Sequence, residues 1–461
     1  MTLEEYVQSI KDKRICFIGA GISNRPLIRL LLMSGCDVSV RDIRTAEKLD
    51  FEDLSLIGLG AKYKLGEDYL LNLDADIIFR SPSFLPFNPS LEEAKSRGAE
   101  ITSEMEVFFR VCPCRTIAVT GSDGKTTTSS IIAELLKEAG YTVHLGGNIG
   151  KPLLCETPLF DKDDIAVLEL SSFQLHSMYC KPDVAVVTNI SPNHLDKHRN
   201  LEDYVSAKEN IFKYQDSSCT LVLNCSDSVC RSFAEKAEAR IRWFSDGEKN
   251  GNGYFCIDNK IICIKDGQSR ELFGTEAVRL PGRHNIQNYL AAFAAVDSFC
   301  PEACFKKVAG EFAGVEHRLE FVRELHGVTY INDSIGTSPS RTIAALHSFS
   351  LKPIVILGGY DKHIPFDNLG DEVCRFAKAA VLTGASAEKI KDAICRSQFY
   401  SPDELPLVSA ENLVDAVYEA GKLAKAGDRV ILSPACASFD CFKNFEERGN
   451  FFKKTVMEMP E

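Results

Sequence analysis

The sequence predicts an α/β protein with several domains, each built around a mainly parallel β-sheet. Short apolar runs alternate with amphipathic stretches of helix length along the whole chain, which is the pattern of repeated βαβ units. A chain of 461 residues is too long for one ordinary domain, and two to four are expected. The composition, 45% hydrophobic and 26% charged, is that of a soluble globular protein and argues against a disordered, collagen-like or membrane-embedded one.

The charge balance and the cysteines limit the partners and the compartment. A net charge of −12 disfavours a broad surface for nucleic acid or anionic membranes, although a local phosphate pocket remains compatible with it. The 17 cysteines are scattered, without a CxxC pair, so we expect free thiols in a reducing compartment. The N-terminus lacks the apolar segment of a signal peptide, and no apolar run reaches the roughly 20 residues needed to span a bilayer. These features predict a cytoplasmic protein.

The expected strands end in polar or small residues, where ligand groups gather in parallel sheets. Continuous apolar runs of this kind are typical of strands that are buried on both faces. By residue number, they are 14–18, 38–41, 76–79, 116–120, 165–170, 184–188, 329–331, 354–357, 380–382 and 429–432. Residues 217–280 carry short strands and turns and are expected to form an antiparallel part. Breaks near residues 112–114 and 314–317 predict domains 1–111, 112–315 and 316–461.

The strongest local signal is a glycine loop between a strand and a helix, AVTGSDGKTTT. In such a loop the backbone N–H groups of Gly121 to Gly124 surround phosphate oxygens, and the helix N-terminus favours negative charge. Lys125 is placed to reach the β- and γ-phosphates, and the Thr126 hydroxyl to bind Mg²⁺. Val119 departs from the full GxxxxGK[ST] pattern. The loop predicts an ATP-type phosphate site.

Three ionisable residues follow at strand ends or on a helix after this loop. Glu169 ends an apolar strand, a position suited to a Mg²⁺ ligand, and His194 follows the strand at 184–188. Lys208 lies four residues from both Tyr204 and Phe212, which puts its ammonium on the apolar face of a helix. Two interpretations stay open: a structural lysine that extends to solvent, and an amine that reacts with CO₂ to give a metal-binding carbamate.

Two further regions carry candidate ligand groups. Near the N-terminus, GAGISN follows a strand and Asp42 comes about twenty residues later, which resembles a dinucleotide fingerprint with Asn24 in place of the third glycine. NAD(P) and a UDP group fit this loop equally well, and Arg44 is placed to meet phosphates. In the last third, YINDS, GGYDK and SPACAS all end strands, and together they predict a site for an anionic small molecule.

The chain resembles the Mur ligase family over residues 15–453. The resemblance is carried by TGSDGKTTT, GGNIGKPL, LELSSFQL, TNISPNHLDKH, YVSAKENIF, PGRHNIQN, EHRLE, INDSIGTSPSRT, ILGGYDKH and SPACASFDCFKNFEERGNFF. LELSSFQL and the last motif favour the branch that adds D-glutamate. The family implies a Rossmann-like N-terminal domain that binds UDP, a central P-loop ATPase α/β domain and a Rossmann-like C-terminal domain that binds the amino acid.

The resemblance also implies the reaction and the partners. It is an amide ligation of D-glutamate to UDP-N-acetylmuramoyl-L-alanine through an acyl phosphate, which consumes ATP and serves peptidoglycan precursor synthesis. Two Mg²⁺ ions and a carbamate on Lys208 are implied, in a monomer without nucleic-acid or membrane partners.

The roles of individual residues follow from matching motifs. For catalysis these are Lys125, His194 and Lys208. For ATP they are Gly121, Ser122, Asp123, Gly124, Lys125, Thr126, Thr127, Asn285, Asn288, Arg318 and Asp333. For metal they are Thr126, Glu169, His194 and carbamylated Lys208. For the UDP-substrate they are Ile22, Ser23, Arg44, Ser81 and Asn148, and for D-glutamate Thr337, Lys362, Ser438 and Phe445.

The chain also departs from the family's common motifs. NDSKATN appears as NDSIGTSP, so Ile335 stands where a lysine is usual. SPSF replaces SPGI, and GSDGKT replaces GTNGKS. Alternatives that remain are a sister ligase for another amino acid, a folate polyglutamate ligase, a non-catalytic nucleotide-binding protein and an NAD-dependent oxidoreductase. The intact Lys125, Glu169, His194 and Lys208 argue against a non-catalytic protein, and an oxidoreductase leaves the phosphate loop unexplained.

Overall fold

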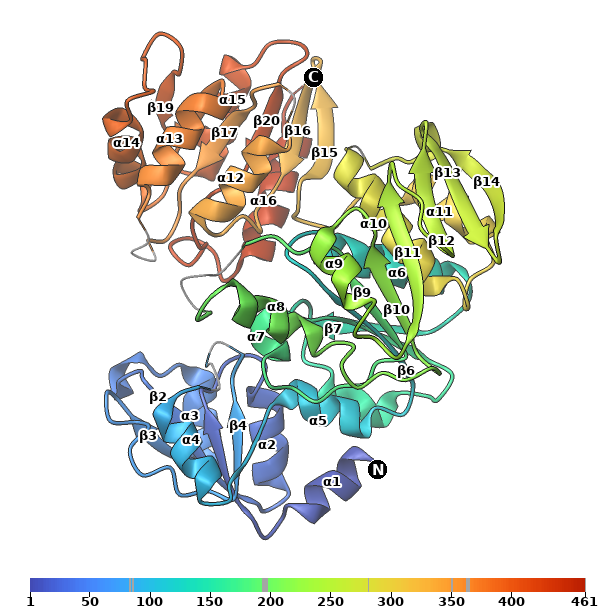
Figure 1. Cartoon of the computed structure of the whole chain (residues 1–461). Helices are drawn as coiled ribbons and strands as arrows, with labels where there is room; N and C mark the ends of the chain where they lie inside the picture. The colour runs from blue at the N-terminus through green and yellow to red at the C-terminus, as the bar shows by residue number, and fades with distance from the viewer. Residues whose placement is uncertain are drawn as a thin grey trace. The chain divides into compact units, whose positions relative to one another are not determined.

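The computed structural model describes residues 1–82, 84, 87–192, 198–280, 282–349, 351–361 and 365–460. The chain divides into two compact units, Met1–Phe312 and Ala313–Glu461. The described strands form three sheets, two in the first unit and one in the second (Figure 1). The expected α/β class is therefore confirmed.

The N-terminal sheet is parallel throughout and has the order β3-β2-β1-β4-β5. Its strands are β1 (Arg14–Ile18), β2 (Asp37–Asp42), β3 (Lys62–Leu65), β4 (Ile77–Arg80) and β5 (Glu100–Thr102). The neighbouring helices are α1 (Leu3–Ser9), α2 (Arg25–Met33), η1 (Ala46–Lys48), α3 (Phe51–Gly58), α4 (Pro89–Ser96) and α5 (Glu104–Val111).

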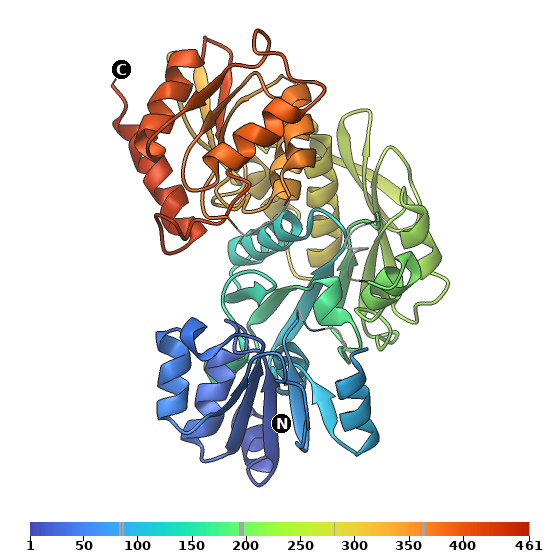
Figure 2. The same cartoon turned by 90° about the vertical axis from the view of Figure 1, so that its left-hand side faces the viewer.

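Alternate side chains of β1 explain why this sheet is covered on both faces. Ile15 and Phe17 pack into one buried apolar cluster, and Cys16 and Ile18 pack into another, because successive side chains of a strand point to opposite faces. Figure 2 shows the blue strands with helices on both sides. From β1 the chain adds β2 and β3 on one side of the sheet, and then β4 and β5 on the other. In parallel sheets, ligands bind beyond the carboxyl ends of the two strands where the order reverses in this way, here β1 and β4.

The central sheet has nine strands in the order β14-β13-β12-β11-β10-β9-β6-β8-β7. They are β6 (Arg115–Thr120), β7 (Val143–Gly147), β8 (Ile165–Glu169), β9 (Val184–Val187), β10 (Thr220–Asn224), β11 (Arg240–Asp246), β12 (Gly253–Ile257), β13 (Lys260–Lys265) and β14 (Gln268–Gly274). The helices are α6 (Lys125–Glu138), η2 (Leu154–Leu159), α7 (Ser172–Leu175), α8 (Leu201–Glu209), α9 (Ser228–Phe233), η3 (Thr275–Ala277), α10 (Arg283–Val296) and α11 (Ala303–Glu311).

The expected antiparallel part covers only the end of residues 217–280. Strands β12, β13 and β14 pair antiparallel, whereas β10 and β11 pair parallel with their neighbours and extend the main sheet. One face of this sheet packs on α6 and α10 through Ile117 and Val119 of β6. Ala118, between them, faces a cluster that continues into the N-terminal sheet. This continuous core explains why both sheets belong to one compact unit.

The second unit contains a six-stranded sheet in the order β15-β16-β20-β17-β18-β19, antiparallel only between β15 and β16. Its strands are β15 (Glu320–Leu325), β16 (Val328–Asn332), β17 (Ile354–Leu357), β18 (Ala379–Leu382), β19 (Leu407–Ser409) and β20 (Arg429–Leu432). Its helices are α12 (Pro339–His347), α13 (Asp367–Phe376), α14 (Ala387–Arg396), α15 (Leu413–Leu423) and α16 (Phe445–Glu458).

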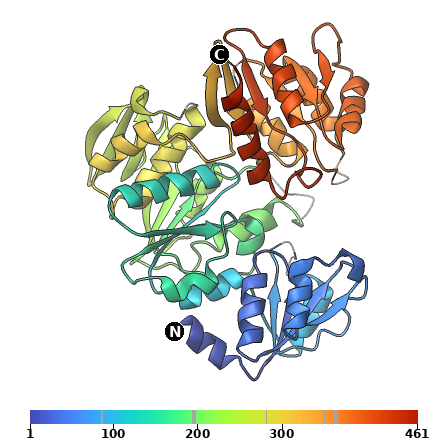
Figure 3. The ribbon, with the colours of Figure 1, turned by 180° about the vertical axis from the view of Figure 1, so that it is seen from behind.

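Helices cover both faces of this sheet as well. Val355 and Leu357 of β17 share a cluster with α12 and α13, and Ile354 and Ile356 share one with α15 and α16. Figure 3, the view from behind, shows the dark red helix α16 on the near face. All 17 cysteines are free thiols, as expected. Within the described ranges, no helix is long and apolar enough to cross a membrane.

Candidate active site

The glycine loop connects β6 to α6, as predicted, and two of its glycines are required by the backbone. Gly121 has φ +146°, and a Cβ there would lie 1.9 Å from Oγ1 of Thr188. Gly124 has φ +77°, and its Cβ would lie 2.3 Å from Oδ1 of Asn288. Only glycine fits such close approaches combined with positive φ. The loop therefore lies with its backbone against two neighbouring segments, at the N-terminus of a helix.

Replacing Gly121 by alanine is expected to weaken ADP binding. Backbone strain of this kind costs roughly 1–3 kcal/mol, which corresponds to a roughly 5- to 150-fold higher Kd. Isothermal titration of ADP measures the effect. Gly58→Ala is the matched control, since Gly58 has no positive φ and a Cβ there has no atom within 4 Å. An unchanged Kd in Gly121→Ala would show that the tight fit of the loop does not support nucleotide binding.

Two of the residues predicted to hold Mg²⁺, Thr126 and Glu169, lie next to each other. Thr126 Oγ1 donates to Oε2 of Glu169 over 2.7 Å, and Nδ2 of Asn148 donates to Oε1 of the same carboxylate over 2.9 Å. Glu169 is buried, at 2% exposure. A hydroxyl and a carboxylate at a phosphate loop are the oxygen ligands that Mg²⁺ prefers. The donor set therefore fits this ion.

Lys125 and Lys208 converge on one backbone oxygen of the loop. The Gly121 carbonyl accepts from Lys125 Nζ over 3.0 Å and from Lys208 Nζ over 2.7 Å. Lys208 is 1% exposed, which confirms its predicted burial, and its Nζ lies 4.8 Å from the centre of the Tyr204 ring. Burial and then the charge of Lys125 lower the pKa of Lys208 well below its usual range. A buried lysine of this kind favours the neutral amine.

Several residues that support the loop were not found from the sequence. Thr188 Oγ1 donates to the Asp123 carbonyl over 2.6 Å, and Asn189 Oδ1 accepts from the Asp123 backbone N–H over 3.0 Å. The Ser122 hydroxyl hydrogen-bonds with the Tyr204 hydroxyl over 2.8 Å. Thr188 and Asn189 directly follow the buried strand β9, and this position was the signal available in the sequence. Tyr204 lies on α8.

The predicted adenosine residues Asn285 and Asn288 lie in the first two turns of α10, beside the loop. Thr128 Oγ1 donates to Oδ1 of Asn288 over 3.3 Å, and Nδ2 of Asn288 donates to Oδ1 of Asn285 over 3.1 Å. Both asparagines are buried. Thr127, also assigned to ATP, is buried on the first turn of α6. The structure thus brings these predicted residues to one end of the central sheet.

The N-terminal loop follows β1 and lies beside the end of β4. Ser81 follows β4 and its N–H donates to the Ile18 carbonyl over 3.1 Å, beside Gly19, whose added Cβ would lie 3.2 Å from Oγ of Ser81. Asn24, the departure from the dinucleotide fingerprint, donates from Nδ2 to the Gly19 carbonyl over 2.8 Å and so holds the loop closed.

The other predicted UDP residues differ in their surroundings. Ile22 is 76% exposed, on the same loop as Ser23. The guanidinium of Arg44 is held by two carboxylates, with NH2 2.8 Å from Asp42 Oδ2 and NH1 2.8 Å from Asp53 Oδ2. An anion bound by Arg44 would have to share it with these partners.

In the second unit, three predicted segments meet at the carboxyl ends of β16, β20 and β17. The Ser433 hydroxyl donates to Asp333 Oδ2 over 2.7 Å, and the Gly358 N–H donates to the Pro434 carbonyl over 2.9 Å. Burial raises the pKa of Asp333 to about 6. These strands are neighbours in the sheet, so the loops that follow them lie at one edge, and we call this position, where the sequence predicts a site, the edge site.

The remaining predicted residues of this unit lie around that edge. Arg318 is half-buried and its charge acts on Asp333, while the Thr337 N–H donates to the carbonyl of Ile335 over 2.8 Å. Ser438 is buried, and Phe445 begins α16 with its carbonyl accepting from the Ser334 hydroxyl over 2.8 Å. The assignments of His194 and Lys362 lie outside the described residues.

A buried arginine that the sequence reasoning missed connects two of these segments. Arg448 donates from NH2 to the carbonyls of Ser334 and Cys436, and from NH1 to that of Ala437, each over 3.0 Å. It is 4% exposed, and burial lowers its pKa to about 10. An arginine on a helix is usually exposed, so the sequence offered no reason to expect its burial. Its place inside the motif FEERGN was the available signal.

Strand β6, the loop 121–124 and helix α6 have the arrangement of a phosphate-binding loop, which places the protein in the class of P-loop nucleotide-binding proteins.

Residues 119–296 match the model of the Mur ligase middle domain, and residues 317–436 match that of the Mur ligase, glutamate ligase domain. Two relatives are UDP-N-acetylmuramoylalanine–D-glutamate ligases. The one from Acetivibrio thermocellus is 47% identical over 458 residues, with 98% of both chains covered. The one from Ruminiclostridium cellulolyticum is 45% identical over 457 residues, again with 98% of both covered. The chain belongs to the Mur ligase family.

Solved structures agree on the fold. The UDP-N-acetylmuramate-alanine ligase of Thermotoga maritima has a TM-score of 0.54 at 20% identity, with 96% of this chain and 99% of that chain covered. E. coli FolC with ADP has a TM-score of 0.55 at 16% identity, with 77% and 92% covered. At these identities the likeness concerns the fold alone.

Proposed function

We propose that this protein joins D-glutamate to UDP-N-acetylmuramoyl-L-alanine in an ATP-dependent reaction that gives ADP and phosphate, a step of peptidoglycan precursor synthesis. The observation that carries the proposal is the 47% identity over almost the whole chain to a ligase of that name. Two contacts at the loop support it, that of Thr126 with Glu169 and that of Lys125 with the Gly121 carbonyl. The ATP-dependent part of the reaction needs these groups at the phosphates.

Forming an amide from a carboxylate at neutral pH requires a better leaving group than oxide. The L-alanyl carboxylate attacks the γ-phosphorus of ATP, and the bond from that phosphorus to the bridging oxygen breaks. ADP departs, and the carboxylate has become an acyl phosphate. The D-glutamate amine attacks the acyl carbon, and phosphate leaves with the bonding electron pair while the amine loses a proton. No covalent bond to the protein is needed, so the residues act by position and charge.

The phosphate loop supplies the positive charge in this proposal. Lys125 and the N-terminus of α6 bind the β- and γ-phosphates, and Asn285 and Asn288 contact the adenosine side. Thr126 and Glu169 hold one Mg²⁺, and His194 with carbamylated Lys208 holds a second. Mg²⁺ bound there neutralises charge on the phosphate oxygens. The 2.7 Å contact between Thr126 and Glu169 supports the first set.

A carbamate on Lys208 has a physical basis in its surroundings. The neutral amine attacks CO₂ and releases one proton, which leaves a carboxylate on the side chain. Its buried position and lowered pKa favour the unprotonated amine that this reaction needs. The alternative that the sequence left open, a lysine extended to solvent, does not agree with 1% exposure.

The two other substrates are assigned to the remaining sites. UDP binds beyond the carboxyl ends of β1 and β4, with Ile22, Ser23, Arg44 and Ser81, and Asn148 faces the sugar side. D-Glutamate binds at the edge site of the second unit with Thr337, Lys362, Ser438 and Phe445, and Arg318 and Asp333 serve ATP. The domains proposed are 1–111, 112–315 and 316–461, in a cytoplasmic monomer.

The test is phosphate release with Mg-ATP and UDP-N-acetylmuramoyl-L-alanine in the presence of D-glutamate, L-glutamate or no amino acid. Release is expected with D-glutamate alone, because the acyl phosphate needs an amine held in the correct configuration. Equal release with L-glutamate would contradict the assigned specificity. No phosphate release in any of the three reactions would mean that the acceptor or the nucleotide sugar has been assigned wrongly. The substrates of the sister ligases would then be tried.

A further inference from the structure

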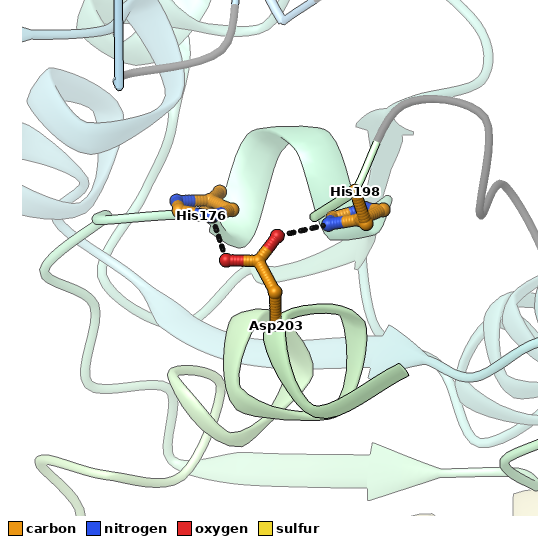
Figure 4. A group of neighbouring side chains, drawn as sticks. All are labelled: His176, His198 and Asp203. Atoms are coloured by element: carbon orange, nitrogen blue, oxygen red, sulfur yellow. Dashed lines mark hydrogen bonds and ion pairs between the residues drawn. The ribbon is translucent and has the colours of Figure 1, made fainter. Parts of the chain in front are cut away.

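A cluster of two histidines and one aspartate lies on the central domain apart from the phosphate loop. Nε2 of His176 is 3.0 Å from Oδ1 of Asp203, and Nδ1 of His198 is 2.9 Å from Oδ2 of the same carboxylate. Figure 4 shows Asp203 rising from helix α8 between the two rings, with one oxygen turned to each. The three ligand atoms lie within 4.8 Å of one another.

The surrounding fold holds each of these side chains in place. His176 follows α7, and its backbone carbonyl accepts from the buried Arg80. His198 comes just before α8, and its ring stacks on Phe173 with 5.2 Å between centroids. Asp203 lies in the first turn of α8, where its N–H donates to the Asn200 side chain over 2.8 Å. The cluster therefore joins the segment after β8 to helix α8.

One histidine of the cluster has an outer hydrogen-bond partner of the kind that metal-binding histidines have. Nε2 of His198, which faces away from Asp203, is 3.0 Å from the Ser172 hydroxyl. A ligating histidine usually has such a partner for its second nitrogen, which fixes the ring and its tautomer. With Nδ1 bound to an ion, Nε2 carries the proton, and its N–H can donate a hydrogen bond to the Ser172 hydroxyl oxygen. On His176, Nδ1 is buried without a partner among the described residues, so Asp203 is the one group that fixes its ring by hydrogen bonding.

The cluster is also open to solvent on one side. His176 and Asp203 line a surface pocket of ≈420 Å³, together with Ser206, Glu209 and Asn210. The side chains of His176 and Asp203 are 17% and 18% exposed, while that of His198 is 0% exposed. The pocket gives an ion a route to His176 and Asp203, and room for a water molecule as a further ligand.

The cluster is separate from the residues assigned to Mg²⁺ and ATP. Asp203 and Lys208 are five residues apart on the same helix, which turns their side chains about 140° away from each other. The ligand types differ as well. Two imidazole nitrogens and a carboxylate suit zinc and similar first-row metals, whereas Mg²⁺ prefers oxygen ligands alone.

We propose that His176, His198 and Asp203 form a binding site for a divalent transition metal of the zinc class, with three protein ligands and a water from the pocket. Zinc takes tetrahedral nitrogen and oxygen ligands at about 2.0–2.2 Å, so neighbouring ligand atoms lie about 3.3 Å apart. The two nitrogen–oxygen separations of 3.0 and 2.9 Å are close to this spacing. The inference is independent of the proposed ligase reaction.

The experiment is a titration of the purified full-length protein with Zn²⁺ in excess Mg²⁺ and ADP, which keep the phosphate site filled. We expect one Zn²⁺ per chain with a Kd in the micromolar range or below, a rise in Tm with bound zinc, and visible d–d bands when Co²⁺ is used instead. Absence of stoichiometric Zn²⁺ binding in this parent protein would overturn the proposal.

Two variants and a control test the ligand set. His176→Gln keeps a donor toward Asp203 but is a poor metal ligand, and Asp203→Asn removes the carboxylate; each is expected to raise the zinc Kd about 100-fold. His144→Gln is the matched control, because His144 pairs with Asp164 over 2.8 Å without a second histidine, and it should bind zinc like the parent. Zinc binding of parental strength in both His176→Gln and Asp203→Asn would overturn the site.

Discussion

Lys208→Ala is expected to lose ligase activity by a factor on the order of 10³, because it removes a charge-stabilising group at the phosphates. The side chain is buried, and its Nζ donates to the carbonyl of Gly121. Short carboxylates such as acetate are expected to restore part of kcat, since they can occupy the space of the carbamate. Initial rates with and without acetate measure both effects.

The control for this variant is Lys137→Ala. Lys137 is half-exposed at the end of α6 and pairs with Glu134, so its loss should leave the rate unchanged. Activity of Lys208→Ala equal to that of the parent would exclude a role for this lysine. A loss that no carboxylate reverses would assign the function to the amine and not to a carbamate.

The strands that the sequence predicted individually are mostly buried ones. All ten expected strands are present, and they include the central strands β1, β6, β17 and β20. The edge strands β3, β5, β7, β15 and β19 were not predicted individually. Each of these strands has at most one buried residue, because an edge strand is partly solvated. Its apolar pattern in the sequence is therefore weak.

The candidate site shows the same division between local and tertiary signals. The loop residues Gly121 to Thr126 were found because the pattern that binds phosphate is contiguous in sequence. Arg448 was missed because its bonds to the Ser334 and Cys436 carbonyls form only when α16 packs on the loops after β16 and β20, and Ser334 is 114 residues away in the chain. The pairing of His176 with Asp203 was missed for the same reason: neither residue stands in a metal-ligand spacing, and only the packing of α8 on the segment after β8 brings them together.

The other large effect is expected from Glu169→Gln. The amide has the shape of the carboxylate and can still accept from Asn148 Nδ2, while its NH₂ faces the oxygen of Thr126, so the local structure should persist. The substitution removes the one negative charge between Thr126 and Asn148. A Mg²⁺ ion held there would lose its charged ligand, and kcat is expected to fall about 100-fold or more.

Binding measurements separate this loss of metal from a loss of nucleotide. In Glu169→Gln, ADP without Mg²⁺ should bind as in the parent, whereas the gain in affinity that Mg²⁺ provides should shrink, because only the latter depends on the carboxylate. Glu134→Gln, on the half-exposed side of α6, is the control and should keep both values. Suppose instead that Glu169→Gln keeps the Mg²⁺ dependence of the parent. Glu169 would then act through its contacts with Thr126 and Asn148 and not through an ion. The metal ligands would have to lie elsewhere around the loop.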